Sequence, residues 1–187
     1  KVIEARWLSF QTTIEGNIRA ARQLAEEAIS LDPNYAPAYH ALGRATIADI
    51  WLGLTKNPQE SLKKCIELNK KAITLDDSLA VGHTGLGYAL TMARKYDEAI
   101  FHAERGLELE PNSADIVYIY ANILLYIGRQ EESISFFQSA IRLNPKPPNT
   151  YLRHYAAALR DTGRYEEAIA QVKKAIEREP RDIMSYI

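Results

Sequence analysis

The chain has 187 residues, of which 47% are hydrophobic and 25% charged, as is typical of folded globular proteins. Its 23 Lys and Arg are balanced by 24 Asp and Glu, and this formal net charge of −1 lacks the basic excess of a dedicated nucleic-acid binder. No run approaches the roughly 18 apolar residues of a membrane span, and the single cysteine, Cys65, excludes an internal disulfide. We expect a cytoplasmic protein with neither nucleic acid nor membrane as partner. Because the chain opens at Lys1 without a methionine or a signal pattern, we also expect it to be part of a longer protein.

The strongest pattern is a repeat with a period near 34 residues. A residue that ends a helix, usually proline, recurs at spacings of 44, 34, 34 and 35 residues: Pro33, Asp77, Pro111, Pro145 and Pro180. Small residues recur five positions earlier: Ala28, Ala72, Gly106, Ala140 and Ala175. Others recur twelve positions earlier: Ala21, Cys65, Ala99, Ser133 and Ala168. Self-similarity at this period predicts a stacked repeat array.

Five units are expected, each made of two helices. Their predicted ranges are 2–35, 36–79, 80–113, 114–147 and 149–182. In the third unit apolar residues follow the i, i+3, i+4 spacing of a helix on both sides of a break at Arg94-Lys95. Gly128 and Gly163 stand where the turn between two helices needs a left-handed residue.

The second unit is ten residues longer than its neighbours. Asn57 followed by Pro58 and Glu60 is typical of a capped helix start, so its second helix is expected to begin near residue 58. Trp51 lies at the expected hairpin tip, and we favour its folding back onto the second helix over a partner contact.

The end of the array is a second irregularity. Ile169, Val172 and Ile176 of the last unit have only the stretch 182–187 to cover them. Either the natural chain continues, which we favour, or this repeat is a self-association surface.

The repeat resembles the tetratricopeptide repeat. The third unit carries this pattern in Leu86-Gly87, Leu90, Tyr96, Ala99, Ala103, Gly106 and Pro111. The fifth carries it in Gly163, Tyr165, Ala168, Ala175 and Pro180. The resemblance implies an all-α, right-handed α-solenoid superhelix of about five helix-turn-helix repeats, with 1–187 as one domain and an elongated second repeat.

Catalytic motifs are missing from the sequence. It has no Gly-rich phosphate loop, no Cys-x-x-Cys, no His-Glu-x-x-His and no serine nucleophile elbow. The four histidines fall at different repeat positions and form no metal-spaced set: His40, His83, His102 and His154. We therefore expect no enzyme activity, no cofactor and no metal.

The resemblance implies that the first helix of each unit lines a concave, peptide-binding groove. The groove candidates by repeat phase are Arg6, Phe10, His40, Arg44, Thr84, Tyr88, Asp115, Tyr118, Asn122, Arg153 and Arg160. Four arginines against one aspartate would make this face positive, and tyrosine and arginine are enriched at binding hot spots. The expected function is a protein-interaction scaffold that binds a peptide segment with acidic and apolar side chains.

Three alternatives concern the partner. Residues at the places of the family's carboxylate clamp do not match that clamp, so chaperone tails are disfavoured: His40, Arg44, Gly85, Asp115 and Ile119. The segment 28–39 with the elongated second unit is similar to repeat regions behind bacterial class III adenylate/guanylate cyclase domains, which implies a regulatory or dimerising segment of a signalling protein. RNA binding is disfavoured because the pairs at equivalent positions differ between units.

Overall fold

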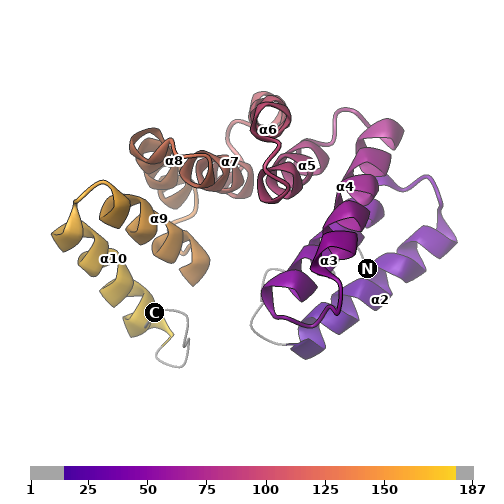
Figure 1. Cartoon of the computed structure of the whole chain (residues 1–187), viewed down its shortest axis with the longest axis horizontal. Coiled ribbons are helices and arrows are strands. Elements are labelled where there is room, and N and C mark those ends of the chain that lie inside the picture. Colours follow the sequence, from indigo (N-terminus) through magenta and orange to yellow (C-terminus); the bar gives the residue numbers. More distant parts are fainter. Residues whose placement is uncertain (1–14, 180–187) are drawn as a thin grey trace. The chain divides into compact units, whose positions relative to one another are not determined.

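The computed structural model describes residues 15–179, and this part of the chain is helical throughout apart from its turns (Figure 1). Its helices fall into two compact units, of which the first ends at Leu109 and the second begins at Glu110. The first unit contains α2 (Glu15–Leu31), α3 (Ala36–Trp51), α4 (Pro58–Leu75), α5 (Ala80–Met92) and α6 (Tyr96–Leu109). The second unit contains α7 (Ala114–Tyr126), α8 (Gln130–Leu143), α9 (Asn149–Asp161) and α10 (Tyr165–Arg178). The expectation of an all-α repeat fold is confirmed, whereas one domain over 1–187 stays a prediction.

Within each unit the helices pack as successive hairpins. Over residues 15–179 the hairpins are α3 with α4, α5 with α6, α7 with α8, and α9 with α10. Each following helix packs on the hairpin before it, as α5 does on α4 and α9 on α8. The contacts depend on small residues, because two helix backbones approach closely only where no long side chain intervenes. In the α2–α3 contact, Ala21 and Ala25 of α2 meet Ala38 and Ala41 of α3, all of them buried.

Gly106, the recurring small residue of α6, shows how closely the backbones of α5 and α6 approach each other. A Cβ atom added at Gly106 would lie 2.5 Å from Cγ2 of Thr84 and 2.9 Å from the carbonyl oxygen of Ala80. The hairpin partner α5 therefore leaves room for glycine and not for alanine. At the equivalent positions Ala72, Ala140 and Ala175 are fully buried.

The turns of the second unit use the glycines that the sequence singles out. Gly128 has φ 91° and Gly163 has φ 79°, which is the left-handed region where glycine has no steric cost. The C-terminal end of α7 is capped after Gly128, because the Arg129 amide donates to the Leu124 carbonyl at 2.9 Å. At the α5–α6 turn Arg94 adopts φ 59° without being glycine.

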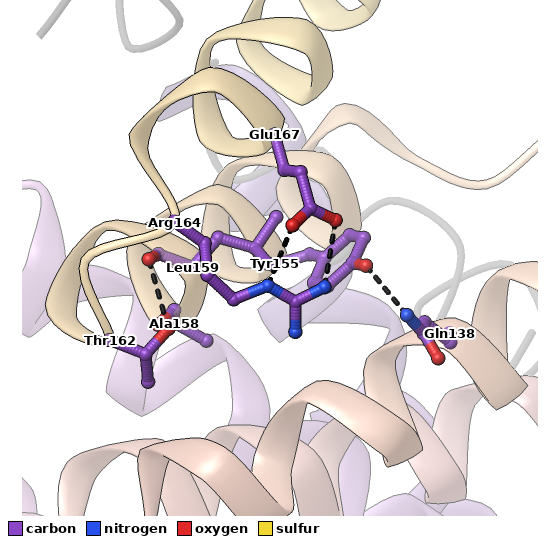
Figure 2. A network of polar contacts seen from close by, with 7 residues as sticks. All are labelled: Gln138, Tyr155, Ala158, Leu159, Thr162, Arg164 and Glu167. Carbon is purple, nitrogen blue, oxygen red and sulfur yellow. Dashed lines mark hydrogen bonds and ion pairs between the residues drawn. The ribbon is translucent and has the colours of Figure 1, made fainter.

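Polar contacts of the last hairpin include one bond to the hairpin before it (Figure 2). The Gln138 amide of α8 donates to the Tyr155 hydroxyl of α9 at 2.9 Å. Arg164, at the α9–α10 turn, binds Glu167 through two bonds of 2.7 Å each. The first bond joins α8 to α9, and the second pair lies at the start of α10.

The second hairpin is elongated, as the sequence predicts. Its helices α3 and α4 have 16 and 18 residues, against 13 and 14 in α5 and α6. The helix α4 begins at Pro58, and the Asn57 side chain accepts from the Glu60 amide at 3.2 Å, which is the expected cap. Trp51 remains 53% exposed, so it does not fold back to close the tip, contrary to our expectation. The cause is local, because α3 ends at Trp51 and the chain turns away through Gly53 at φ 65°.

The apolar side chains expected to be uncovered in the last unit differ in their exposure. Ile169 of α10 is exposed, while Val172 and Ile176 are half-buried. The stretch 182–187, expected to cover them, lies outside the described residues. Self-association through this repeat stays a prediction.

Candidate functional site

Two tyrosines join the first helices of the second unit. Tyr118 of α7 and Tyr151 of α9 stack face to face, with ring centroids 3.9 Å apart and planes 6° from parallel. Tyr151 is fully buried and Tyr118 is 5% exposed. This stack fixes the spacing of α7 and α9 on the face where sequence phase places the binding residues.

Hydrogen bonds between the same two helices surround this stack. The Tyr151 hydroxyl donates to Oδ1 of Asp115 at 2.6 Å, and the Tyr118 hydroxyl is hydrogen-bonded with Nδ1 of His154 at 2.7 Å. The Tyr126 ring meets His154 edge-on at 6.2 Å. We call this surface the α7–α9 face, defined by Asp115, Tyr118, Asn122, Tyr126, Tyr151, Arg153 and His154.

Burial controls the protonation of this face. It raises the pKa of Tyr118 to about 12 and lowers the pKa of His154 to about 4, where the nearby Arg153 charge adds to the effect of burial. The pKa of Tyr126 is also raised by burial. At neutral pH these three rings are uncharged, so the formal charges of the face are those of Asp115 and Arg153.

Asn122 of α7 has its amide almost entirely buried. It is 1% exposed, and its Oδ1 finds no hydrogen-bond donor within residues 15–179. A buried acceptor without a donor has a free-energy cost of about 1–3 kcal/mol. Such an atom gains from any rearrangement that brings a donor to it.

The side chains of this face differ in how far they reach solvent. Tyr126 is 43% exposed, and Asp115, Arg153 and His154 are half-buried. The groove candidates Tyr118 and Asn122 are buried and do not reach solvent, contrary to the expectation that they line a groove. Tyr126, Tyr151 and His154 are not among the sequence candidates, because repeat phase selects one stripe of each helix and these residues lie beside it.

In the first unit the candidates are divided between surface and interior. Arg44 of α3 and Tyr88 of α5 are half-buried, on two helices that contact each other. Both side chains are thus partly exposed, and their place in a groove stays a prediction.

His40 and Thr84 depart from the expectation that they line a groove, because both are buried inside their hairpins. His40 Nδ1 is 2.9 Å from Oδ1 of Asn69 in α4, and a Cβ at Gly85 of α5 would lie 2.7 Å from that nitrogen. The Thr84 hydroxyl bonds the Ala80 carbonyl, and its methyl fills the space beside Gly106. In both cases the next helix covers the side chain.

The remaining candidates are an exposed arginine and two residues near the start of the chain. Arg160 is exposed and its Nε donates to Oδ1 of Asp161 at 2.8 Å, which raises the pKa of the guanidinium and offsets its charge. Arg6 and Phe10 lie outside the described residues. Of the four arginines expected to make the groove positive, Arg44 and Arg153 therefore remain as candidates within residues 15–179.

Metal-binding and reactive groups are a separate question. Over residues 15–179, no group of three or more His, Cys, Asp or Glu side chains is arranged to hold a metal ion. Burial raises the pKa of the Cys65 thiol to about 12, which keeps it protonated and unreactive. None of the helices in this range is both long and apolar enough to cross a membrane.

Comparison with known proteins bears on the fold. A family model described as anaphase-promoting complex, cyclosome, subunit 3 matches residues 92–175. No curated protein matches the chain. These results give no support to the expected similarity to cyclase repeat regions.

Several solved structures are similar over nearly the whole chain. TTC0263, a TPR protein of Thermus thermophilus, is 20% identical with a TM-score of 0.75, covering 100% of this chain and 95% of that one. YrrB, described as a TPR protein with an unusual peptide-binding site, is 19% identical with a TM-score of 0.59, covering 97% and 86%. MamA of Desulfovibrio magneticus is 18% identical with a TM-score of 0.58, covering 97% of each chain. At such identities the likeness establishes the fold alone: this chain has the tetratricopeptide-repeat fold.

Proposed function

We propose that this chain is a non-catalytic interaction scaffold that binds a peptide segment of a partner protein on the first-helix faces of its repeats. The observation that carries the proposal is the α7–α9 face. There the phased candidates Asp115 and Tyr118 of α7 are hydrogen-bonded to Tyr151 and His154 of the next first helix, close to Arg153. Folds of this kind supply repeated, similarly oriented helix surfaces for extended ligands.

The chemistry of the face suits a peptide. Tyr126 offers a half-exposed aromatic surface for an apolar side chain, and Arg153 offers a guanidinium for a carboxylate. Asp115 can accept from a backbone amide or a basic group. The buried Tyr118–Tyr151 stack keeps these groups in place before binding, which reduces the entropy lost on association.

The first unit offers a second surface of the same kind. Arg44 and Tyr88 combine a cation and an aromatic ring on α3 and α5. The peptide we expect therefore carries acidic and apolar side chains. The YrrB description supports this type of ligand for the fold, without specifying it for this chain.

A peptide-display selection against the purified 187-residue chain tests the proposal. Two double variants remove the candidate contacts separately: Tyr126→Ala/Arg153→Glu in the second unit and Arg44→Glu/Tyr88→Ala in the first. A matched control, Tyr165→Ala/Lys174→Glu, makes the same types of change at exposed positions of α10. Circular dichroism and thermal melting verify that all three proteins fold.

We expect acidic, apolar peptides to be enriched on the unmodified chain and on the α10 control, and to be lost on at least one first-helix variant. The variant that loses them identifies the unit that binds. No enrichment on the unmodified chain, or equal enrichment on all four proteins, would overturn the proposal.

A further inference from the structure

Two helices of the first unit carry opposite charges on their exposed faces. Between residues 63 and 71, α4 has four lysines and one glutamate, whereas α6 has four acidic residues and one arginine between residues 97 and 108, all of them exposed. The helix α5 packs against both α4 and α6. The pKa of Glu98 in α6 is lowered mainly by its contact with Lys95 and further by the charge of Lys70 in α4. A basic and an acidic face therefore lie next to each other.

Contacts within the chain neutralise part of both faces. On α4, Lys63 lies 3.9 Å from Glu67, and on α6, Arg105 lies 3.2 Å from Glu108. Some exposed side chains of the two helices form no ion pair within residues 15–179: Lys64 and Lys71 of α4, and Asp97 and Glu104 of α6. On each helix the two members are seven residues apart, which is two turns or about 10.5 Å.

An exposed phenylalanine lies between the two acids of α6. Phe101 is 65% exposed. The other repeats have polar or small residues at the equivalent exposed position: Gln23, Glu67, Ser135 and Ala170. The repeat fold therefore does not need an aromatic ring here, and Phe101 offers apolar surface that a contact would bury.

We propose that a second copy of this chain binds to these faces, with α4 of each copy against α6 of the other. Closed pairs of identical chains are two-fold symmetric, so their contact surface must be complementary to itself. A basic face beside an acidic face meets this condition. Rotation about an axis between the two faces places each of them on its opposite in the other copy.

The spacing of the charges fits this pairing. When a two-fold axis exchanges two helices that face the other copy, α4 of one copy runs in the same direction as α6 of the other. Lys64 and Asp97 lie one and two residues before the first recurring small residue of their repeats, so they stand at nearly the same height. Lys64 thus meets Asp97, and seven residues later Lys71 meets Glu104.

The remaining contact is apolar. Phe101 lies between the two ion pairs, where the methylene stems of the facing lysines cover its ring. Exposed ion pairs contribute little individually and are screened by salt, so we expect a reversible dimer that depends on ionic strength. The peptide contacts proposed above are on α3, α5, α7 and α9, so either kind of binding can be absent without the other.

Sedimentation velocity of the 187-residue chain over a range of concentrations tests the inference. We expect dimers at an ionic strength of about 0.01 M and their loss at about 1 M, where the Debye length is only about 3 Å. Lys64→Glu/Lys71→Glu and Asp97→Lys/Glu104→Lys should each be monomeric, because like charges then face each other. Mixed in equal amounts, these two variants should form a heterodimer, since both of its contacts join opposite charges again.

Phe101→Ser introduces the residue that α8 has at the equivalent position. It should raise the Kd of the dimer by at least about tenfold, because the buried ring is lost.

Ile169→Lys is the matched control, because it changes an exposed apolar side chain of α10, outside the first unit. It should leave the dimer unchanged, and circular dichroism verifies that every variant folds. The inference is overturned if the unmodified chain stays monomeric at low ionic strength, if the mixed variants form no heterodimer, or if Ile169→Lys abolishes the dimer.

Discussion

The imidazole of His40 and the amide of Asn69 are hydrogen-bonded across the α3–α4 hairpin, with 2.9 Å between Nδ1 and Oδ1. The Asn69 Nδ2 atom in turn donates to the Cys65 carbonyl at 2.9 Å. The pair is buried because the backbone of α5 passes over it at Gly85. A residue selected by repeat phase as a surface contact is thus part of the polar interior of the first unit.

Gly85→Ala should destabilise the first unit. The new Cβ would lie 2.5 Å from Oδ1 of Asn69 and 2.7 Å from Nδ1 of His40, so the hydrogen bond and α5 must shift. Overpacking of this kind costs about 1–3 kcal/mol, which urea unfolding measures. Gly16→Ala in α2 is the control, since a Cβ there meets no atom within 4 Å and should leave stability equal or higher. Equal stability of the two variants would contradict the packing of α5 described here.

Gly106→Ala should also destabilise, and the cost should depend on residue 84. The added Cβ would lie 2.5 Å from Cγ2 of Thr84 and 2.9 Å from the Ala80 carbonyl oxygen. In a Thr84→Ser background that methyl is missing, so the same substitution should cost less, although the carbonyl contact remains. A double-mutant cycle by urea unfolding measures the coupling. Additive effects of the two changes would show that residues 84 and 106 are not in contact.

Ala140→Leu should destabilise the second unit by roughly 1–3 kcal/mol, because Ala140 of α8 is fully buried at the phased small position. Ala170→Leu makes the same chemical change at an exposed position of α10 and should be close to neutral. Thermal melting of both proteins checks this. A neutral Ala140→Leu would mean that the repeat phase is wrong.

The second unit should lose stability as the pH falls from about 6.5 to about 4. The pKa of His154 is lowered from its ordinary 6.5 to about 4 in the folded chain, so below 6.5 the unfolded state takes up the proton first. Each pH unit in this window then costs up to about 1.4 kcal/mol. Urea unfolding at pH 7, 5.5 and 4.5 should show a steeper loss for the unmodified chain than for His154→Gln. Parallel pH profiles would show that His154 is not buried neutral.

Much of the architecture could be predicted from sequence because its signals are local and repeated. The helix start at Pro58 follows from the Asn57 cap, and the left-handed turns follow from Gly128 and Gly163. The buried small residues follow from the period, since the same helix contact recurs in each hairpin. These features depend on neighbours in the chain or on repetition, and a single sequence contains both.

The candidate site was predictable only in part. Repeat phase selects Arg153, which is half-buried, and Tyr118, which is as buried as His40. It does not select Tyr126 or His154, and it selects His40, which is buried. Phase defines the side of a helix on which a residue lies, but not how much of that side the next helix covers.

The sequence by itself therefore determined the helices, their caps and the repeat that stacks them, since these depend on local propensity and periodic apolar positions. Only the tertiary structure decided which of the phased side chains reach solvent and which distant ones meet. The stack of Tyr118 on Tyr151 and the facing nitrogens of His83 and His102 depend on helix spacings of a few ångströms. Those spacings are set by how the side chains of two helices pack together, and no pattern within one helix contains them.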